Sequence, residues 1–213
     1  MTLADLRLAL APAVAQAAVF DGWSATAIRT AAQDAGVDPH VARLAFDGGA
    51  MTMIAAWIAS IDRDMTVALP ETTLATLPIR ERIRRLVQFR LDAASPDIEA
   101  LRRALAIMAM PQNVPAALKL SWQSADAMWR LAGDRATDYN HYTKRTILAG
   151  IYAATLTVLA EDTSEDHADT RAFLERRIDG VMKFEKAKAR LLRPRDDSFS
   201  VMRLLGRLRY PAR

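Results

Sequence analysis

Alanine and leucine dominate this chain, and this feature limits most strongly what it can fold into. Of its 213 residues, 41 are alanine and 24 are leucine, whereas only 8 are glycine and 9 are proline. Alanine and leucine are among the strongest helix formers, so we expect an all-α protein. The chain has no cysteine, which excludes a disulfide framework, a thiolate metal site and a thiol nucleophile.

Capping signals divide the chain into about ten predicted helices. Ser24 and Asp38 are typical N-caps, Gly36 is typical of a residue that ends a helix, and Pro12 predicts a kink in the first helix. No run of about 18 uncharged apolar residues occurs. Because Asp5 also interrupts the N-terminal apolar stretch, we expect no membrane-spanning helix, no signal peptide and a location in the bacterial cytoplasm. The helices are expected at residues 3–20, 25–35, 40–46, 50–68, 79–93, 97–108, 114–132, 139–160, 165–192 and 199–208.

The segment from Ser24 to Asp38 has the pattern of a helix-turn-helix. Its small alanines allow two helices to cross closely, and Gly36 provides the tight turn between them. A three-helix unit of this kind at residues 1–48, followed by a longer helical body, resembles the TetR family of repressors.

Charge argues against nucleic-acid binding by this unit. DNA affinity depends mainly on cations that contact phosphates, but residues 1–60 carry a net charge of −2. The would-be recognition helix offers only His40 and Arg43 for base contacts, and Asp38 and Asp47 flank it. We therefore expect a helix-turn-helix remnant and no nucleic-acid partner. A TetR-type transcriptional regulator with a hydrophobic small-molecule effector is the alternative.

The most distinctive segment runs from Trp122 to Arg145. It contains a Trp-x3-Asp-x2-Trp stretch, followed by Gly-Asp-Arg-Ala-Thr-Asp-Tyr-Asn-His-Tyr-Thr-Lys-Arg. This segment resembles the COQ9 family of ubiquinone-biosynthesis accessory proteins, in which tryptophan stands at the position of His141 and serine at that of Ala136. Further similar stretches extend the resemblance over residues 10–185, and they are Phe20–Trp23, Arg102–Pro111 and Thr170–Ile178.

The resemblance implies a TetR-like fold that no longer regulates DNA, in a homodimer formed through the last two long helices. It implies a protein that binds an isoprenoid quinone or a phospholipid in a hydrophobic cavity. Such a protein presents the quinone precursor to a COQ7-type di-iron hydroxylase while associated with the inner membrane. The partner-binding residues that the motif implies are Asp138, Asn140, His141, Tyr142 and Arg145.

The motif residues also have a physical interpretation of their own. Trp122, Asp126 and Trp129 lie on one face of a helix. Lys144 and Arg145 follow the start of the next helix, where the helix dipole disfavours positive charge, so both need carboxylate partners. The carboxylates within reach are those of Asp126, Asp134 and Asp138. A packed core with a buried ion network and a partner-docking surface both remain open.

Methionine and tryptophan are frequent among the residues expected inside the helical body. Methionine adapts to a flexible chain such as a polyisoprenoid, although the same residues would also suit a plain helical core. The candidate lipid-binding residues are Trp57, Ile61, Met65, Leu105, Met108, Met110, Trp122, Met128, Ile147 and Tyr152.

The sequence contains no recognisable catalytic signature. His40, His141 and His167 lie far apart, and neither a His-Glu-x-x-His motif, a repeated Glu-x-x-His motif nor a glycine-rich phosphate loop occurs. We therefore expect no metal, no cofactor and no enzymatic activity, and we assign the hydroxylation chemistry to the partner.

Positive charge is concentrated at the C-terminal end, where residues 171–213 carry a net charge of +8. Within residues 198–210, leucine and valine share one face of a predicted helix and arginines lie opposite. Such a basic amphipathic helix suits an anionic membrane surface, and a helix docked on its own domain is the alternative. The expected membrane-binding residues are Val201, Arg203, Leu204, Leu205, Arg207 and Leu208. The expected segments are thus a helix-turn-helix-like unit at 1–48, a lipid-binding body at 49–193 and a basic tail at 194–213.

Overall fold

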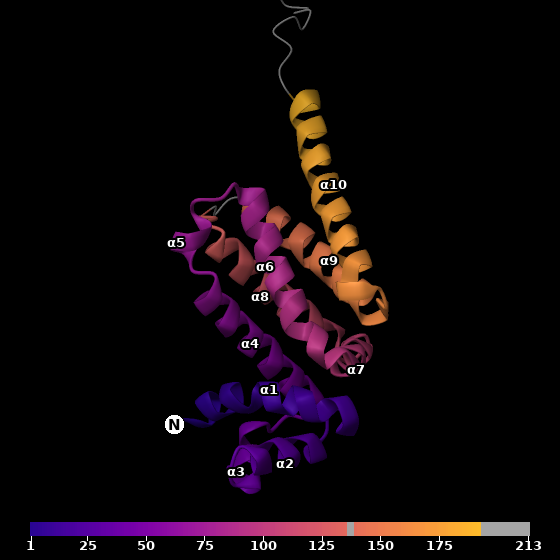
Figure 1. Cartoon of the computed structure of the whole chain (residues 1–213). Coiled ribbons are helices and arrows are strands. Elements are labelled where there is room, and N and C mark those ends of the chain that lie inside the picture. Colours follow the sequence, from indigo (N-terminus) through magenta and orange to yellow (C-terminus); the bar gives the residue numbers. More distant parts are fainter. Residues whose placement is uncertain (136–138, 193–213) are drawn as a thin grey trace, which may run out of the picture. The chain divides into compact units, whose positions relative to one another are not determined.

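The computed structural model describes residues 1–135 and 139–192, with the backbone alone for residues 139–140 and 182–192. In these ranges every regular element is a helix, which confirms the all-α prediction (Figure 1). Nine of the ten predicted helices are observed, and the tenth, at residues 199–208, lies outside the described residues. The α-helices are α1 (Leu3–Asp21), α2 (Ala25–Asp34), α3 (Pro39–Ala45), α4 (Ala50–Ala68), α5 (Glu71–Leu74), α6 (Ile79–Ala94), α7 (Ile98–Met108), α8 (Val114–Leu131), α9 (Tyr139–Glu161) and α10 (Ala168–Leu192).

The chain forms two compact units, residues 1–178 and residues 179–213. The first unit holds α1 to α9 and the first part of α10, and one cluster of buried apolar residues extends through it. The three N-terminal helices therefore share their hydrophobic core with the helical body. The second unit begins inside α10, whose backbone is helical as far as Leu192.

Local capping interactions set the bounds of the three N-terminal helices. Thr2 and Asp5 form a capping box at the start of α1, and the side chain of Ser24 accepts hydrogen bonds from the first amides of α2. Asp38 accepts a hydrogen bond from the amide of His40 at the start of α3. Small side chains allow these helices to approach closely, and the fully or almost fully buried alanines are Ala11, Ala15, Ala18, Ala27, Ala31, Ala32, Ala42 and Ala45.

The composition of α1 reflects burial in this unit. Among the described residues, α1 is long and apolar enough to cross a membrane, as is the bent pair formed by α3 and α4 if it counts as one span. The core helix of a folded domain meets the same test of length and composition. Leu6, Leu10 and Val14 recur every four residues of α1 and are buried, so one face of this helix packs into the core.

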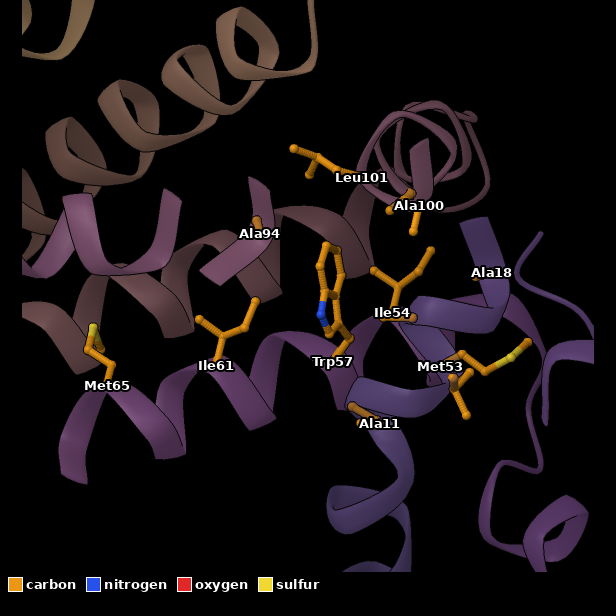
Figure 2. Packing of buried hydrophobic residues seen from close by; sticks show 14 of the residues in the cluster. Ala11, Ala18, Met53, Ile54, Trp57, Ile61, Met65, Ala94, Ala100 and Leu101 are labelled. Carbon is orange, nitrogen blue, oxygen red and sulfur yellow. The ribbon is translucent and has the colours of Figure 1, made fainter. Parts of the chain in front are cut away.

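α4 leads from the three N-terminal helices into the helical body and supplies much of its core (Figure 1). Its buried residues recur every three to four positions, so they form one continuous face. Trp57 packs beside Trp23, with ring centroids 5.5 Å apart. The indole of Trp23 donates a hydrogen bond of 3.0 Å to the carbonyl of Ala100, which ties α7 to the N-terminal helices. Figure 2 shows the labelled α4 residues of this face, which are Met53, Ile54, Trp57, Ile61 and Met65.

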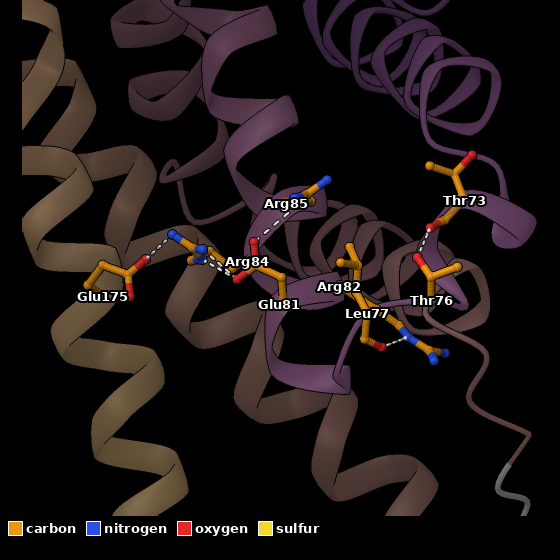
Figure 3. Close-up of polar contacts among 8 residues, drawn as sticks. All are labelled: Thr73, Thr76, Leu77, Glu81, Arg82, Arg84, Arg85 and Glu175. Atoms are coloured by element: carbon orange, nitrogen blue, oxygen red, sulfur yellow. Dashed lines mark hydrogen bonds and ion pairs between the residues drawn. The ribbon is translucent and has the colours of Figure 1, made fainter.

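Arginines of α6 connect this helix to neighbouring segments through hydrogen bonds. The guanidinium of Arg82 donates hydrogen bonds of 2.8 Å each to the carbonyls of Ala75, Leu77 and Ala132, and the contact with Leu77 is drawn in Figure 3. The last of these carbonyls belongs to the end of α8, so Arg82 satisfies acceptors that the helix leaves free. Two residues further along α6, Arg84 joins Glu81 of its own helix to Glu175 of α10, at 3.2 Å from the latter (Figure 3).

Candidate functional site

A cavity of about 50 Å³ lies between α4, α6, α7, α8 and α9. Its walls are mostly apolar, and the lining residues whose side chains carry a hydrogen-bonding group are Trp57, Arg90, Ser121, Ser124 and Tyr152. This volume accommodates a few water molecules, because about one probe-sized sphere is needed for each. A lipid tail therefore requires some of the lining side chains to move.

The candidate lipid-binding residues divide into two groups. Those that line the cavity are Trp57, Ile61, Leu105, Met108 and Tyr152. The others lie outside its walls: Met65 and Met128 are fully buried in the core, Met110 is 43% exposed, and Trp122 and Ile147 are partly buried elsewhere. Their residue types led us to expect both groups inside the body, but only the packing of the helices decides which of them meet a cavity.

Arg90 is a cavity residue that the sequence interpretation missed. It is 0% exposed, forms an ion pair with Asp62, and donates a hydrogen bond of 2.9 Å to the hydroxyl of Ser124. Its guanidinium also lies over the ring of Tyr152, at 4.9 Å from the centroid. The sequence does contain a signal for the burial of Arg90, because this residue lies on the same face of α6 as the buried Ile83.

A cluster of three aromatic rings, which we call the aromatic surface, joins α8 to the start of α9. Trp122 and Tyr142 stack with their ring centroids 5.9 Å apart and their planes at 29°. The ring of His141 lies 5.1 Å from that of Tyr142 and 6.4 Å from that of Trp122. Tyr142 is 61% exposed, and Leu118, one turn before Trp122 on α8, is 66% exposed. The aromatic surface therefore offers apolar area to solvent.

A buried ion network supports the aromatic surface. Arg145 contacts Asp126 at 2.6 Å and Asp134 at 3.0 Å, and Lys144 contacts Asp134 at 2.7 Å. Trp129 lies against this network, because its indole donates a hydrogen bond of 3.1 Å to the carbonyl of Lys144. The expectation that both cations need carboxylate partners is confirmed for Asp126 and Asp134.

The electrostatics of Asp134 follow from these contacts. Burial alone would raise its pKa, but hydrogen bonds from Lys144 and Arg145, together with their charges, hold the pKa of Asp134 below its ordinary value. The carboxylate is therefore ionised over the physiological pH range, which keeps the network charged and paired.

The partner-binding candidates occupy different environments. His141 and Tyr142 belong to the aromatic surface, whereas Arg145 is 1% exposed and lies beneath it. Direct partner contact by Arg145 does not fit this burial, and we assign it a positioning role through Asp126 and Asp134. The other candidates fall outside the described residues or side chains, and they are Asp138, Asn140, Val201, Arg203, Leu204, Leu205, Arg207 and Leu208.

The described part of the chain contains no group of three or more histidine, aspartate or glutamate side chains placed to hold a metal ion. The geometry therefore offers a small apolar cavity with a charged wall and an exposed aromatic surface. Both the cavity and the aromatic surface are suited to binding another molecule.

Sequence comparison connects these features to known proteins. The COQ9 family model matches residues 114–185, which include α8, α9 and the aromatic surface. The "Ubiquinone biosynthesis protein COQ9, mitochondrial" of Rattus norvegicus is 37% identical over 168 residues, which cover 76% of this chain and 54% of the rat protein. The protein of the same name from Homo sapiens is 36% identical over 168 residues, which cover 76% of this chain and 52% of the human protein. This chain thus spans about half the length of the curated relatives that it matches.

Structure comparison identifies the architecture. The crystal structure of a TetR transcriptional regulator from Nitrosomonas europaea ATCC 19718 superposes with a TM-score of 0.67, covering 84% of this chain and 99% of the regulator. At 22% sequence identity this likeness concerns the fold alone, and it confirms the TetR-like prediction. Residues 114–185 are therefore a COQ9 domain, and the chain is a homologue of the COQ9 proteins built on a TetR-like fold.

Proposed function

We propose that this protein is a lipid-binding accessory protein of ubiquinone biosynthesis. It holds the polyisoprenoid quinone precursor and presents it to a COQ7-type di-iron hydroxylase at the membrane. The role in ubiquinone biosynthesis is suggested by the names of its relatives. The observation that carries the proposal is the exposed aromatic surface, which lies within the matched COQ9 segment and rests on a buried ion network.

The aromatic surface is suited to a protein partner. Aromatic side chains dominate binding energy in protein interfaces, because they remove a large area from water at a small cost in conformational entropy. Trp122 and Tyr142 already hold one another in place, so little order needs to be gained on binding. The imidazole of His141, in place of the family's tryptophan, offers a smaller apolar area to the partner.

The cavity provides the basis for lipid binding. Its apolar lining includes Met108 and Leu105, and both are only partly buried. Methionine repacks at small cost, so displacement of these side chains enlarges the cavity toward the surface. In this proposal the protein performs no catalytic step, and the partner carries the iron. The protein acts as a homodimer attached peripherally to the membrane by the basic tail at residues 194–213.

Transcriptional regulation is the second candidate, favoured by the TetR-like fold alone. The local chemistry of α3 opposes it. Asp38 places a carboxylate at the N-terminus of α3, the end that a recognition helix directs at base edges. Val41 and Leu44 are exposed on the same helix, where a DNA-reading helix presents polar side chains.

One experiment tests the proposal and separates it from the alternative. The protein is purified, its lipids are extracted and identified by mass spectrometry, and its effect on the turnover of a COQ7-type hydroxylase is measured with a quinone precursor. We expect a bound isoprenoid quinone or phospholipid and a stimulated hydroxylase. A lipid-free protein that leaves turnover unchanged and binds double-stranded DNA at physiological salt would favour the regulator instead.

A further inference from the structure

The turn that joins α7 to α8 is exposed and carries no charge. Residues 104–118 contain no charged side chain. Within this stretch Met110 is 43% exposed, Val114 is 39% exposed, and Pro111 between them is exposed as well. We call residues 107–115 the α7–α8 corner.

Phe20 adds a large aromatic side chain beside this corner. It lies in the last turn of α1 and is 85% exposed. The guanidinium of Arg103 in α7 donates hydrogen bonds of 3.3 Å and 3.2 Å to the carbonyls of Ala18 and Phe20, so the end of α1 lies against α7 (Figure 1). Ile107, the first residue of the corner, follows Arg103 by one turn on the same side of α7. Phe20 therefore lies close to the start of the corner.

Hydrogen bonds inside the corner satisfy much of its backbone. The amides of Asn113 and Val114 donate to the carbonyl of Met110 at 2.8 Å and 3.2 Å, and the amide of Met110 donates to the carbonyl of Ile107 at 3.2 Å. The side-chain amide of Asn113 donates a further bond of 2.8 Å to the same carbonyl of Ile107. Polar backbone groups must be paired before a segment enters a bilayer, so these bonds lower the cost of removing the corner from water.

The charges at the border of the corner favour an anionic partner. Between Glu99 and Asp126 the sequence has no acidic residue, whereas Arg102, Arg103 and Lys119 lie in this interval. Both arginines pair with the single carboxylate of Glu99, so positive charge remains in excess. An uncharged apolar centre with cations at its border suits an anionic bilayer, in which apolar side chains enter the interface and cations stay at the phosphates.

The hydrogen-bonding capacity of the corner favours a bilayer over a protein partner. Protein interfaces contain about one hydrogen bond for every 100–200 Å². In residues 104–118 the side chains with a hydrogen-bonding group are those of Gln112 and Asn113, and Asn113 already serves Ile107. The corner therefore offers apolar area with few side-chain groups to direct a protein partner.

We infer that the α7–α8 corner, together with Phe20, inserts into the interface of an anionic bilayer. This inference rests on the membrane location in the proposed function, and it adds a contact from the folded unit that is separate from the tail at residues 194–213. Val114 lies one turn before Leu118 on α8, and Leu118 lies one turn before Trp122 of the aromatic surface. The bilayer and the hydroxylase thus contact adjoining turns of one helix.

The absence of cysteine from the chain allows a site-specific test on the full-length protein. Met110→Cys is labelled with the polarity-sensitive fluorophore NBD. Leu44→Cys, labelled in the same way, is the control, because Leu44 is 63% exposed but lies between Asp38 and Asp47 in the sequence. The vesicles contain phosphatidylcholine and phosphatidylglycerol in equal parts, with or without a nitroxide on the acyl chains. We expect the label at position 110 to shift to the blue and to be quenched by the nitroxide, and the label at position 44 to remain in water.

Vesicle sedimentation measures the contribution of the exposed side chains to binding. The double variant Phe20→Ser with Met110→Ser should bind about tenfold more weakly than the wild type, equivalent to about 1.4 kcal/mol, because two apolar side chains leave the interface. The matched control is Leu44→Ser with Val67→Ser, whose side chains are 63% and 77% exposed, and it should bind as the wild type does. All four positions are exposed, and circular dichroism checks that both variants remain folded.

The outcomes separate this inference from the proposed function. Vesicle binding without quenching at position 110 overturns the inference and leaves attachment by the tail intact. Equal affinities of the two double variants overturn it as well. A blue shift at position 110 that appears without vesicles and grows with protein concentration would show that a second copy of the chain covers the corner, which also overturns it. Insertion at position 110 without stimulation of the hydroxylase would refute only the accessory role.

Discussion

Arg145 and Asp134 form an ion pair of 3.0 Å that is almost completely shielded from solvent, with side-chain exposures of 2% and 7%. Asp134 lies just after α8, and Arg145 lies in the second turn of α9. Their contact therefore fixes how α9 starts relative to the end of α8. Tyr142 belongs to that same start, so the ion pair also sets where its ring meets Trp122.

We predict that Asp134→Asn destabilises the protein by about 3 kcal/mol. Loss of one partner from a buried pair leaves an uncompensated charge, which typically costs about 3–5 kcal/mol, and Asp126 moderates the loss by retaining its contact with Arg145. Urea denaturation measures the change. Asp64→Asn, in the exposed pair with Arg63, is the control and should change stability by less than about 0.5 kcal/mol. Equal effects of the two variants would contradict the structural role of the network.

The ion network also predicts a pH dependence. The pKa of Asp134 is lower in the folded protein than its ordinary value of about 4, so its contribution to stability is complete above pH about 4. That contribution is lost as the pH falls through the folded-state pKa. The difference in unfolding free energy between wild type and Asp134→Asn should therefore shrink as the pH is lowered from 6 to 3 in denaturation experiments. A difference that stays constant would show that the charge of Asp134 is not responsible.

We predict that Tyr142→Lys weakens the complex with a COQ7-type hydroxylase by about 30-fold, which corresponds to about 2 kcal/mol. The residue is exposed, so the melting temperature should change little. Val67→Lys is a matched control, because Val67 is 77% exposed and belongs to α4, which contributes no residue to the aromatic surface. The affinity for the purified hydroxylase is measured by surface plasmon resonance. An unchanged affinity of Tyr142→Lys would argue against the aromatic surface as the docking site.

Leu118→Lys extends the same test along α8. Leu118 is 66% exposed and precedes Trp122 by one helical turn, so a partner that covers the aromatic surface should also cover Leu118. We expect Leu118→Lys to weaken binding to the hydroxylase, as Tyr142→Lys does, when both are measured in the same assay. If Leu118→Lys binds as the wild type does, the partner contacts α9 without reaching this part of α8.

Deletion of residues 196–213 should reduce binding to anionic liposomes and leave the helical core folded. Each arginine near an anionic surface contributes about 1 kcal/mol, and the apolar face adds burial in the interface, so raising salt should weaken binding. Leu204→Asp should weaken it at every salt concentration, because it places a charge on the face that the sequence predicts to be apolar. Liposome sedimentation and circular dichroism measure the two effects. A sharp drop in melting temperature for Leu204→Asp would show instead that this segment packs on the core.

The sequence alone determined the helices, because their signals are local. Ser24 and Asp38 mark helix starts through hydrogen bonds within a few residues, and the structure contains both caps. The need of Lys144 and Arg145 for carboxylates was likewise predictable, since it follows from the helix dipole and neighbouring residues. The four-residue α5 was not, because so short a segment between Pro70 and Pro78 has no periodicity to detect.

Only the tertiary structure decided which residues form the sites. Met65, Met108 and Met110 are alike in sequence character, yet one is in the core, one lines the cavity and one is exposed. The burial of Arg90 and Arg145 depends on carboxylates and hydroxyls that other helices bring to them. Helix propensity and periodicity give the inward face of each helix, but the partner that this face meets depends on how the helices cross. For that reason the sequence predicted a cavity and a docking motif, whereas the crossing of the helices determines which residues line the cavity and which are buried or exposed near the motif.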